Sequence, residues 1–203
     1  MSSPIDFYFD FSSPYGYLAA QRIEALAEKH GRSVDWHPVL LGVIFKSTGG
    51  APLTTLPLKG EYSKRDFARS ARYHGIEEFR QPSVFPIASQ APARIVLWLK
   101  ASNADAAAPA RVAKALYRAY FVDGIDISSP DEAVAVAAKE GVDPVAARAA
   151  IDDPAIKAAL KDEVDRALAR GVFGSPFIFV DDEPFWGLDR FDQIERWLAT
   201  GGF

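Results

Sequence analysis

The sequence predicts an α/β fold in which a long helical segment interrupts a small sheet domain. Strand-like apolar runs occur only near the two ends of the chain, whereas the middle has a helical pattern almost throughout. A chain of 203 residues is long enough for one domain that carries a large insertion. We therefore expect one α/β domain from residues 1–60 and 171–203, and an inserted helical domain from residues 61–170.

The N-terminal part is expected to form a strand, a helix and a second strand. Ile5 to Phe11 is an apolar and aromatic run, typical of a buried strand. Tyr15 to His30 has helical periodicity, and Ser33 to Val39 alternates as a strand does. A right-handed strand–helix–strand crossover makes the two strands parallel. A short helix and then a loop rich in Gly, Pro and Thr are expected next, over residues 40–46 and 47–60.

The middle of the chain predicts a series of helices. Three have clear apolar periodicity, and three more begin with a capping side chain followed by proline at the first helical position, where the missing N–H costs nothing. The last of them is expected to end before Gly171. In order, these helices are expected over 63–74, 91–100 and 109–121, and from Ser129-Pro130, Asp143-Pro144 and Asp153-Pro154.

The C-terminal part predicts a hairpin and a final helix. Phe177 to Val180 and Glu183 to Trp186 are strand-like and are separated by a short turn. Asp189 is expected to cap a helix over residues 190–200. With the helical middle set aside, the element order is strand–helix–strand followed by strand–strand–helix. That order is the order of a thioredoxin-like domain, here with an all-helical domain inserted after the second strand.

Composition excludes several classes of function. The chain has no cysteine, so it has neither disulfides, nor thiolate metal ligands, nor a cysteine nucleophile. A net charge of −4 gives no reason to expect nucleic acid binding. The N-terminal residues have no signal-peptide pattern and no apolar run is long enough to span a membrane, so we expect a cytoplasmic protein. The three histidines have no metal-ligand spacing, and we expect no metal site.

Two stretches far apart in the sequence predict one site. Ser12 and Ser13 precede Pro14 at a helix N-terminus, which is most often a plain helix cap but also attracts anions. Near the other end of the chain, Ser175-Pro176 comes directly before a strand. In a thioredoxin-like topology this proline lies beside the first helix and its peptide bond is expected to be cis. The backbone N–H and C=O of Ser175 would then face a groove able to hold a thiol-bearing peptide.

The residues of both stretches resemble those of a known family. Asp10-Phe-Ser-Ser-Pro-Tyr15 is similar to the active-site stretch of disulfide oxidoreductases, with Ser13 and Gly16 where their two cysteines would stand. The chain most resembles the kappa-class glutathione transferases and their bacterial relatives, the 2-hydroxychromene-2-carboxylate isomerases. The resemblance covers nearly the whole chain. Three further stretches support the resemblance. They are the loop that runs from Pro38-Val-Leu-Leu-Gly42 through Lys59-Gly-Glu-Tyr62, the stretch Val172-Phe-Gly-Ser-Pro176 and the stretch Phe185-Trp-Gly-Leu-Asp-Arg190.

The resemblance implies that Ser13 donates a hydrogen bond to the sulfur of glutathione. A thiol with a pKa of about 8.5 must drop by about two units, or about 2.7 kcal/mol, to be mostly ionised at neutral pH. A helix N-terminus supplies about 0.3–1 kcal/mol and a hydroxyl that donates to the anion about 1.5–3 kcal/mol. Together they are sufficient. Since no base stands in a triad or elbow motif, Ser13 is better interpreted as a donor than as a nucleophile.

The resemblance also implies the remaining contacts. The Ser175 backbone would meet the cysteinyl part, Asp189 the γ-glutamyl ammonium, and Lys59 the glycyl carboxylate or an acidic substrate. At Gly50 and Leu188, relatives carry asparagine and serine contacts, so only backbone contacts remain there. Tyr15 and Trp186 are candidates for an aromatic substrate pocket. The full expected set for glutathione is Ser13, Pro14, Tyr15, Gly50, Lys59, Ser175, Pro176, Leu188 and Asp189.

These residues together predict a glutathione-dependent isomerase of aromatic catabolism. Glutathione would serve as a cofactor that adds reversibly to a small aromatic carboxylate, 2-hydroxychromene-2-carboxylate, and forms trans-o-hydroxybenzylidenepyruvate. Two alternatives stay open: a kappa-like glutathione transferase or peroxidase acting on other electrophiles, and a non-catalytic module that binds peptides in the groove. Members of the family are typically dimers, which implies a homodimer.

Overall fold

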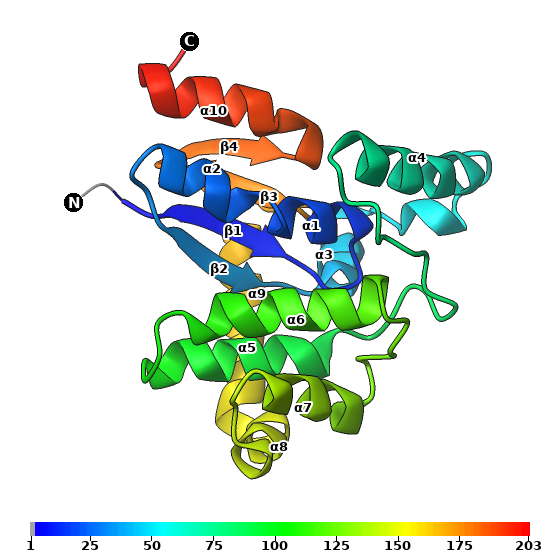
Figure 1. The fold of residues 1–203 in the computed structure, drawn as a ribbon, viewed down its shortest axis with the longest axis vertical. Helices are drawn as coiled ribbons and strands as arrows, with labels where there is room; N and C mark the ends of the chain where they lie inside the picture. The colour runs from blue at the N-terminus through cyan, green and yellow to red at the C-terminus, as the bar shows by residue number, and fades with distance from the viewer. Residues whose placement is uncertain (1–2) are drawn as a thin grey trace.

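A four-stranded mixed sheet forms the centre of this computed structural model, which describes residues 3–203. The strand order is β2-β1-β3-β4 (Figure 1). β1 (Ile5–Phe9) pairs parallel with β2 (Val34–Pro38), as the crossover argument predicts. On its other side β1 pairs antiparallel with β3 (Phe177–Val180), and β3 continues into the hairpin partner β4 (Glu183–Trp186).

The two faces of the sheet are covered by different helices because side chains alternate along each strand. Ile5, Phe7 and Phe9 of β1 are fully buried in the larger core. The helices that share this core include α1 (Pro14–Ala20), α2 (Ile23–Lys29), α6 (Ala108–Phe121) and the C-terminal helix α10 (Phe191–Thr200). Tyr8 points to the opposite face, where α3 (Leu41–Thr48) and α9 (Pro154–Ala169) pack. This alternation places the end of β1, and the residues that follow it, between the two layers of helices.

The prediction of one helix over residues 15–30 is wrong in one respect, because the segment forms two helices. α1 (Pro14–Ala20) ends before α2 (Ile23–Lys29) begins, and Arg22 between them has φ −123° and ψ −26°, outside helical geometry. The Arg22 guanidinium lies over the Phe191 ring, 5.0 Å from its centroid. Apolar spacing continues across the break, so the sequence pattern did not reveal it.

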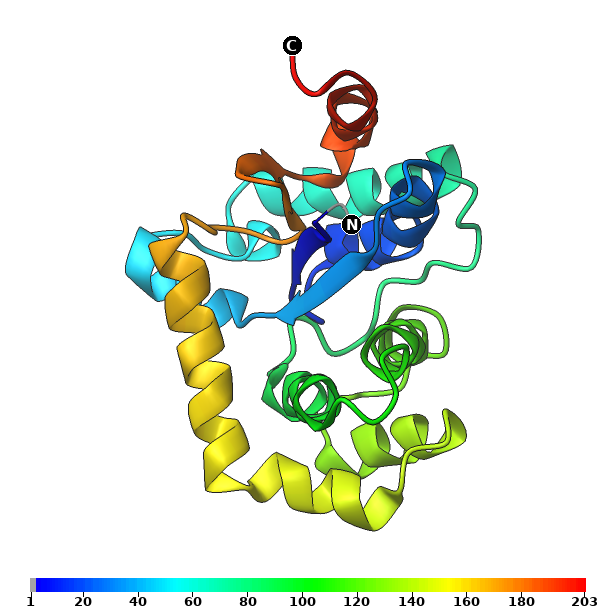
Figure 2. The same ribbon diagram turned by 90° about the vertical axis from the view of Figure 1, so that its left-hand side faces the viewer.

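The predicted helices of the middle are present, and the three proline-led starts are capped as expected. The side chains of Ser129, Asp143 and Asp153 accept hydrogen bonds from first-turn amides. Figure 2 shows α9 running from the layer of helices below the sheet back to the sheet itself. The helices are α4 (Lys59–Tyr73), α5 (Gln90–Ser102), α6 (Ala108–Phe121), α7 (Pro130–Lys139), α8 (Pro144–Asp152) and α9 (Pro154–Ala169).

Helix α4 begins earlier than predicted, inside the expected loop 47–60. A 3-10 turn η1 (Leu53–Thr55) comes first, and α4 then starts at Lys59. The Gly60 backbone packs so closely on this turn that a Cβ there would lie 2.7 Å from the Thr54 carbonyl oxygen. Gly60 therefore permits a close approach between backbones and does not mark a loop.

Helix α6 of the predicted insertion shares one hydrophobic core with the sheet. Tyr117 and Phe121 are fully buried, and the Tyr117 ring lies 4.9 Å from that of Phe11. The division into residues 1–60 with 171–203 and 61–170 stays a prediction, and its first two residues, Met1 and Ser2, lie outside the described residues. In the described part of the chain, no helix has both the length and the apolar character that a membrane crossing requires.

Candidate active site

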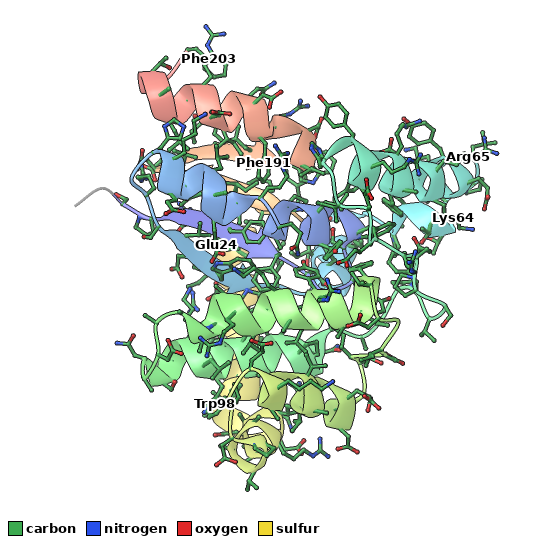
Figure 3. All side chains as sticks on the ribbon, viewed as in Figure 1. Glu24, Lys64, Arg65, Trp98, Phe191 and Phe203 are labelled. Carbon is green, nitrogen blue, oxygen red and sulfur yellow. The ribbon has the colours of Figure 1, made fainter. Side chains whose placement is uncertain are left out.

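A cavity of about 1460 Å³ lies where the N-terminus of α1 meets the segment before β3. Its walls come from α1, α3, the following loop, α4, the segment 85–90 and the turn η2 (Leu188–Arg190). Phe191, labelled in Figure 3, lines the cavity at the start of α10. Ligand pockets usually measure about 300–1,000 Å³. The cavity is therefore large enough for two small molecules side by side.

Ser13 caps α1 and lines this cavity. Its hydroxyl accepts the Gly16 N–H at 3.0 Å and donates to the Ser175 carbonyl oxygen at 2.8 Å. Pro14 occupies the first helical position, as predicted, and also lines the cavity. The Ser13 side chain is 5% exposed, so both hydrogen bonds are shielded from water. The Ser13 hydroxyl therefore both caps α1 and joins it to the backbone of Ser175.

The Ser175–Pro176 peptide bond is cis, as expected from the topology. The Ser175 hydroxyl accepts the Asp10 N–H at 3.0 Å, and the Pro176 carbonyl accepts the Gly187 N–H at 3.1 Å. Ser175 and Pro176 both line the cavity. The two ends of the chain thus meet at Ser13, and this backbone segment is anchored on both sides.

Asp10 is a residue that the sequence reasoning did not single out as functional. Its buried carboxylate accepts the Ser12 N–H at 2.7 Å and the Leu41 N–H at 2.5 Å. Burial raises the pKa of Asp10, while the hydrogen bonds from these two amides oppose the shift. The carboxylate joins the end of β1 to the start of α3. The available signs were its place directly after a buried strand and its position as the first residue of the Asp10–Tyr15 motif.

Tyr117 reaches the same point from α6. Its hydroxyl donates to the Asp10 carbonyl at 2.8 Å. A Cβ at Gly16 would lie 2.7 Å from this hydroxyl oxygen, 2.8 Å from the Ser175 Oγ and 3.1 Å from the Ser13 Cβ. Only glycine fits at position 16, because these three side chains fill the space that a larger residue would need. No pattern near Tyr117 in the sequence indicates this role.

Tyr15 and Trp186 lie on the cavity wall, where the aromatic pocket was predicted. The Tyr15 hydroxyl donates to Asp66 of α4 at 2.5 Å, and its ring meets the Phe67 ring edge-on at 4.9 Å. Burial, together with the Asp66 carboxylate, raises the pKa of Tyr15. Trp186 is 55% exposed and packs edge-on against Phe173. Both rings contribute aromatic surface to the cavity wall.

Asp189 lines the cavity, but it does not cap the last helix as predicted. It belongs to the turn η2, and α10 begins at Phe191 without a side-chain cap. Its carboxylate folds back over Gly187, whose φ of 106° few other residues adopt, and pairs with Arg190 at 3.2 Å. Leu188 is buried beside it and also lines the cavity. The inserted turn moves the start of the helix past Asp189.

Gly50 lies on the cavity wall, whereas Lys59 does not. Lys59 opens α4 and is exposed, outside the set of lining residues. The cations that do line the cavity are Arg22, Lys46 and Arg190, none of which the sequence analysis singled out. On the cavity wall itself, these three cations are the candidates for carboxylate recognition, and Lys59 lies outside it.

His37 forms an ion-pair cluster away from the cavity. Its Nδ1 lies 2.6 Å from the Glu163 carboxylate, and its Nε2 lies 3.2 Å from Asp35 and 3.5 Å from Asp6. Burial lowers the pKa of His37, but hydrogen bonds to these three carboxylates outweigh it and raise the pKa to about 10. Asp6, Asp35 and His37 are close enough to hold a metal ion. The contacts of the cluster are ion pairs, which Lys100 extends to Asp35 and Arg170 extends to Asp6.

Comparison with known proteins places the chain in a family. The family model described as DSBA-like thioredoxin domain matches residues 4–199. A 2-hydroxychromene-2-carboxylate isomerase of Pseudomonas putida is 33% identical over 94% of this chain and 92% of its own length. Glutathione S-transferase kappa 2 of Caenorhabditis elegans is 26% identical over 96% of this chain and 91% of its own length. A solved 2-hydroxychromene-2-carboxylate isomerase superposes with a TM-score of 0.85 at 28% identity, covering 96% of this chain and 94% of that one.

These findings confirm the predicted thioredoxin-like fold with its helical insertion and the resemblance noted from the sequence motifs. They also confirm the expectation of an enzyme of the isomerase type. The chain therefore belongs to the DSBA-like thioredoxin family and, within it, to the family of the 2-hydroxychromene-2-carboxylate isomerases.

Proposed function

We propose that this chain is a glutathione-dependent isomerase that interconverts 2-hydroxychromene-2-carboxylate and trans-o-hydroxybenzylidenepyruvate. The observation that carries the proposal is the Ser13 hydroxyl, which lines a large cavity beside the cis Ser175–Pro176 bond. The glutathione thiolate adds to the opened, conjugated substrate and converts a double bond into a single bond. Rotation about that bond and elimination of the thiolate then give the product and regenerate glutathione.

The Ser13 hydroxyl has the larger share in stabilising the thiolate. α1 has only seven residues, so its dipole contributes at the low end of about 0.3–1 kcal/mol. A hydroxyl that donates to an anion contributes about 1.5–3 kcal/mol, and the shielding of Ser13 from water favours the upper part of that range. The sum is close to the roughly 2.7 kcal/mol that a shift of two pKa units requires.

The other expected contacts distribute glutathione along the cavity. The cysteinyl part pairs with the Ser175 backbone beside Pro176, with Pro14 and Tyr15 near the sulfur. The γ-glutamyl ammonium binds Asp189, with a backbone contact at Leu188. The glycyl end meets Gly50 by its backbone, and Lys59 reaches its carboxylate from outside the lining residues.

The second part of the cavity takes the aromatic substrate. Tyr15 and Trp186 supply flat apolar surface for the ring. The cavity volume of about 1460 Å³ supports simultaneous binding of glutathione and a second small molecule. We further propose that the enzyme works in the cytoplasm as a homodimer, in the breakdown of aromatic compounds.

A kappa-like glutathione transferase or peroxidase is the second candidate function. The observation that favours it is the 26% identity to a glutathione S-transferase over nearly the full chain. A transferase consumes glutathione as its electrophile reacts, whereas an isomerase leaves the glutathione concentration unchanged. Measurement of free thiol during turnover separates the two. A non-catalytic peptide-binding module would show no turnover with either kind of substrate.

The test of the sulfur-donor role is Ser13→Ala. Turnover of the chromene carboxylate should fall by about one to three orders of magnitude, the effect expected for one hydrogen bond to a developing anion. Ser129→Ala is the matched control, because Ser129 also caps a helix ahead of proline but lies at the start of α7, outside the cavity lining. Both variants lose a helix cap, and only the first should lose activity. Unchanged turnover in Ser13→Ala would refute the donor role.

A further inference from the structure

The Ser13 hydroxyl has one proton, and that proton is already engaged. A carbonyl oxygen only accepts, so the 2.8 Å contact with the Ser175 carbonyl uses the Ser13 proton. An amide N–H only donates, so the 3.0 Å contact with Gly16 uses an acceptor position of the hydroxyl. In this arrangement the hydroxyl has only a lone pair left to offer a ligand. A lone pair does not stabilise a sulfur anion.

The Ser175 carbonyl is held in place, whereas the Ser13 hydroxyl can turn its proton toward another acceptor. Ser175 is anchored by its own side chain to the Asp10 N–H, and Pro176 by its carbonyl to the Gly187 N–H. Ser175 is 8% exposed, so its carbonyl would remain unpaired and shielded from water if the hydroxyl simply turned away. Release of the Ser13 proton therefore requires another donor for this carbonyl.

The neighbouring backbone offers a place for such a donor. Among residues 3–203, the Ser175 N–H has no hydrogen-bond partner, and its carbonyl has only the Ser13 hydroxyl. Ser175 lines the cavity directly ahead of β3. In an antiparallel pair, one residue exchanges both its N–H and its C=O with the residue opposite. An extended ligand in the cavity would thus bring its own N–H to the Ser175 carbonyl.

We propose that the amide N–H of a bound peptide thiol takes over the Ser175 carbonyl and thereby releases the Ser13 hydroxyl to the sulfur. The inference rests on the proposed use of glutathione and adds a requirement to it. The residue that carries the thiol must also carry the N–H, because the sulfur has to reach the Ser13 hydroxyl while the N–H reaches the Ser175 carbonyl beside it. When the hydroxyl turns to the sulfur, the thiol loses its proton to water and the anion gains a donor.

This exchange makes the site selective for thiols with an adjacent amide. A thiol without the N–H binds beside a hydroxyl that still donates to Ser175, and it ionises less readily. The difference equals the penalty of a buried carbonyl left without a donor, about ten- to a hundredfold in the ionisation constant. Glutathione meets the requirement because its cysteine contributes both groups.

The experiment compares glutathione with an analogue in which an ester oxygen replaces the cysteinyl amide N–H. The ultraviolet absorbance of the thiolate is followed against pH for each ligand bound to the wild-type protein and to Ser13→Ala. Each ionisation constant is referred to that of the same thiol free in solution, which removes the intrinsic effect of the ester. Calorimetric titration of the wild-type protein with glutathione establishes binding beforehand.

In the wild-type protein, bound glutathione should ionise about ten- to a hundredfold more readily than the bound ester, after this correction. In Ser13→Ala the two ligands should agree within about twofold, because no hydroxyl remains to be released. Equal ionisation of both ligands in the wild-type protein overturns the inference without any variant. A difference that persists in Ser13→Ala overturns it as well. Absence of glutathione binding would instead refute the proposed function, and this inference with it.

Discussion

Replacement of Gly16 by alanine tests the close packing behind Ser13. The new Cβ would lie 2.7 Å from the Tyr117 hydroxyl and 2.8 Å from the Ser175 Oγ. Both groups are buried, and Tyr117 also holds the Asp10 carbonyl at 2.8 Å. The new methyl group therefore displaces the Tyr117 hydroxyl, which gives up its hydrogen bond to Asp10, and it also overpacks the space around position 16.

The expected loss of stability follows from three terms. Overpacking costs about 1–3 kcal/mol, and an Asp10 carbonyl left without its donor costs about 1–3 kcal/mol. Alanine in place of a helical glycine returns about 0.5–1 kcal/mol. The net destabilisation is about 1–5 kcal/mol. Since about 1 kcal/mol shifts Tm by about 2–4 °C in a protein of this size, Tm should fall by at least about 2 °C.

Gly42→Ala is the matched control, and thermal melts are the assay. Gly42 also lies in a helix, α3, but a Cβ there meets nothing within 4 Å. Gly42→Ala should therefore raise stability by about 0.5–1 kcal/mol. In the double variant Gly16→Ala with Tyr117→Phe, the oxygen nearest the new methyl is gone. The double variant should therefore lose less stability than the sum of the losses in the two single variants. A Gly16→Ala protein that melts at or above the wild-type Tm would refute the packing argument.

Three further outcomes are expected. The pKa of His37 is about 10 in the folded protein, above its ordinary 6.5, because burial, which lowers it, is outweighed by hydrogen bonds to three carboxylates. The contribution of His37 to the free energy of unfolding is therefore complete below about pH 6.5 and is lost as the pH rises through about 10. Urea unfolding of the wild-type protein should show a decline on the order of a few kcal/mol over that range, and a decline of the same size in His37→Gln would contradict it. The pKa of Glu163 is about 2, below its ordinary 4.5, because burial, which raises it, is outweighed by hydrogen bonds from His37 and Arg166. Glu163→Gln should therefore lower stability near neutral pH and have no effect as the pH falls toward about 2. Acid titration followed by circular dichroism checks this. Asp189→Asn should weaken glutathione binding by about tenfold in calorimetry while Tm stays unchanged, because the side chain is exposed and caps no helix; undiminished affinity would remove Asp189 from the proposed site.

Local features of the fold were predictable because their interactions span only a few residues. The Ser13, Ser129 and Asp153 caps each bind an amide two or three residues further along, so the sequence contains both partners. The alternation of Ile5, Phe7 and Phe9 likewise identifies the buried face of β1. The break at Arg22 and the turn that displaces Asp189 from its cap left the apolar spacing unchanged, which is why neither was predicted.

The candidate site was predictable only where a motif marked it. Ser13 and Ser175 stand next to prolines in recognisable stretches, and the structure brings them within 2.8 Å of each other. Tyr117 has no such mark, although its hydroxyl fills the space beside Gly16. For His37 the sequence indicated only that it lacks metal-ligand spacing, because its partners come from β1, β2 and α9.

The sequence by itself determined the order of the elements, most of their ends and the two stretches that form the site. Only the tertiary structure decided which atom receives the Ser13 proton, which residue requires glycine at position 16 and which charges surround His37. Capping and strand alternation are short-range effects that one segment of chain contains in full. A hydrogen bond between Ser13 and Ser175, 162 residues apart, exists only after the sheet and both helical layers have packed.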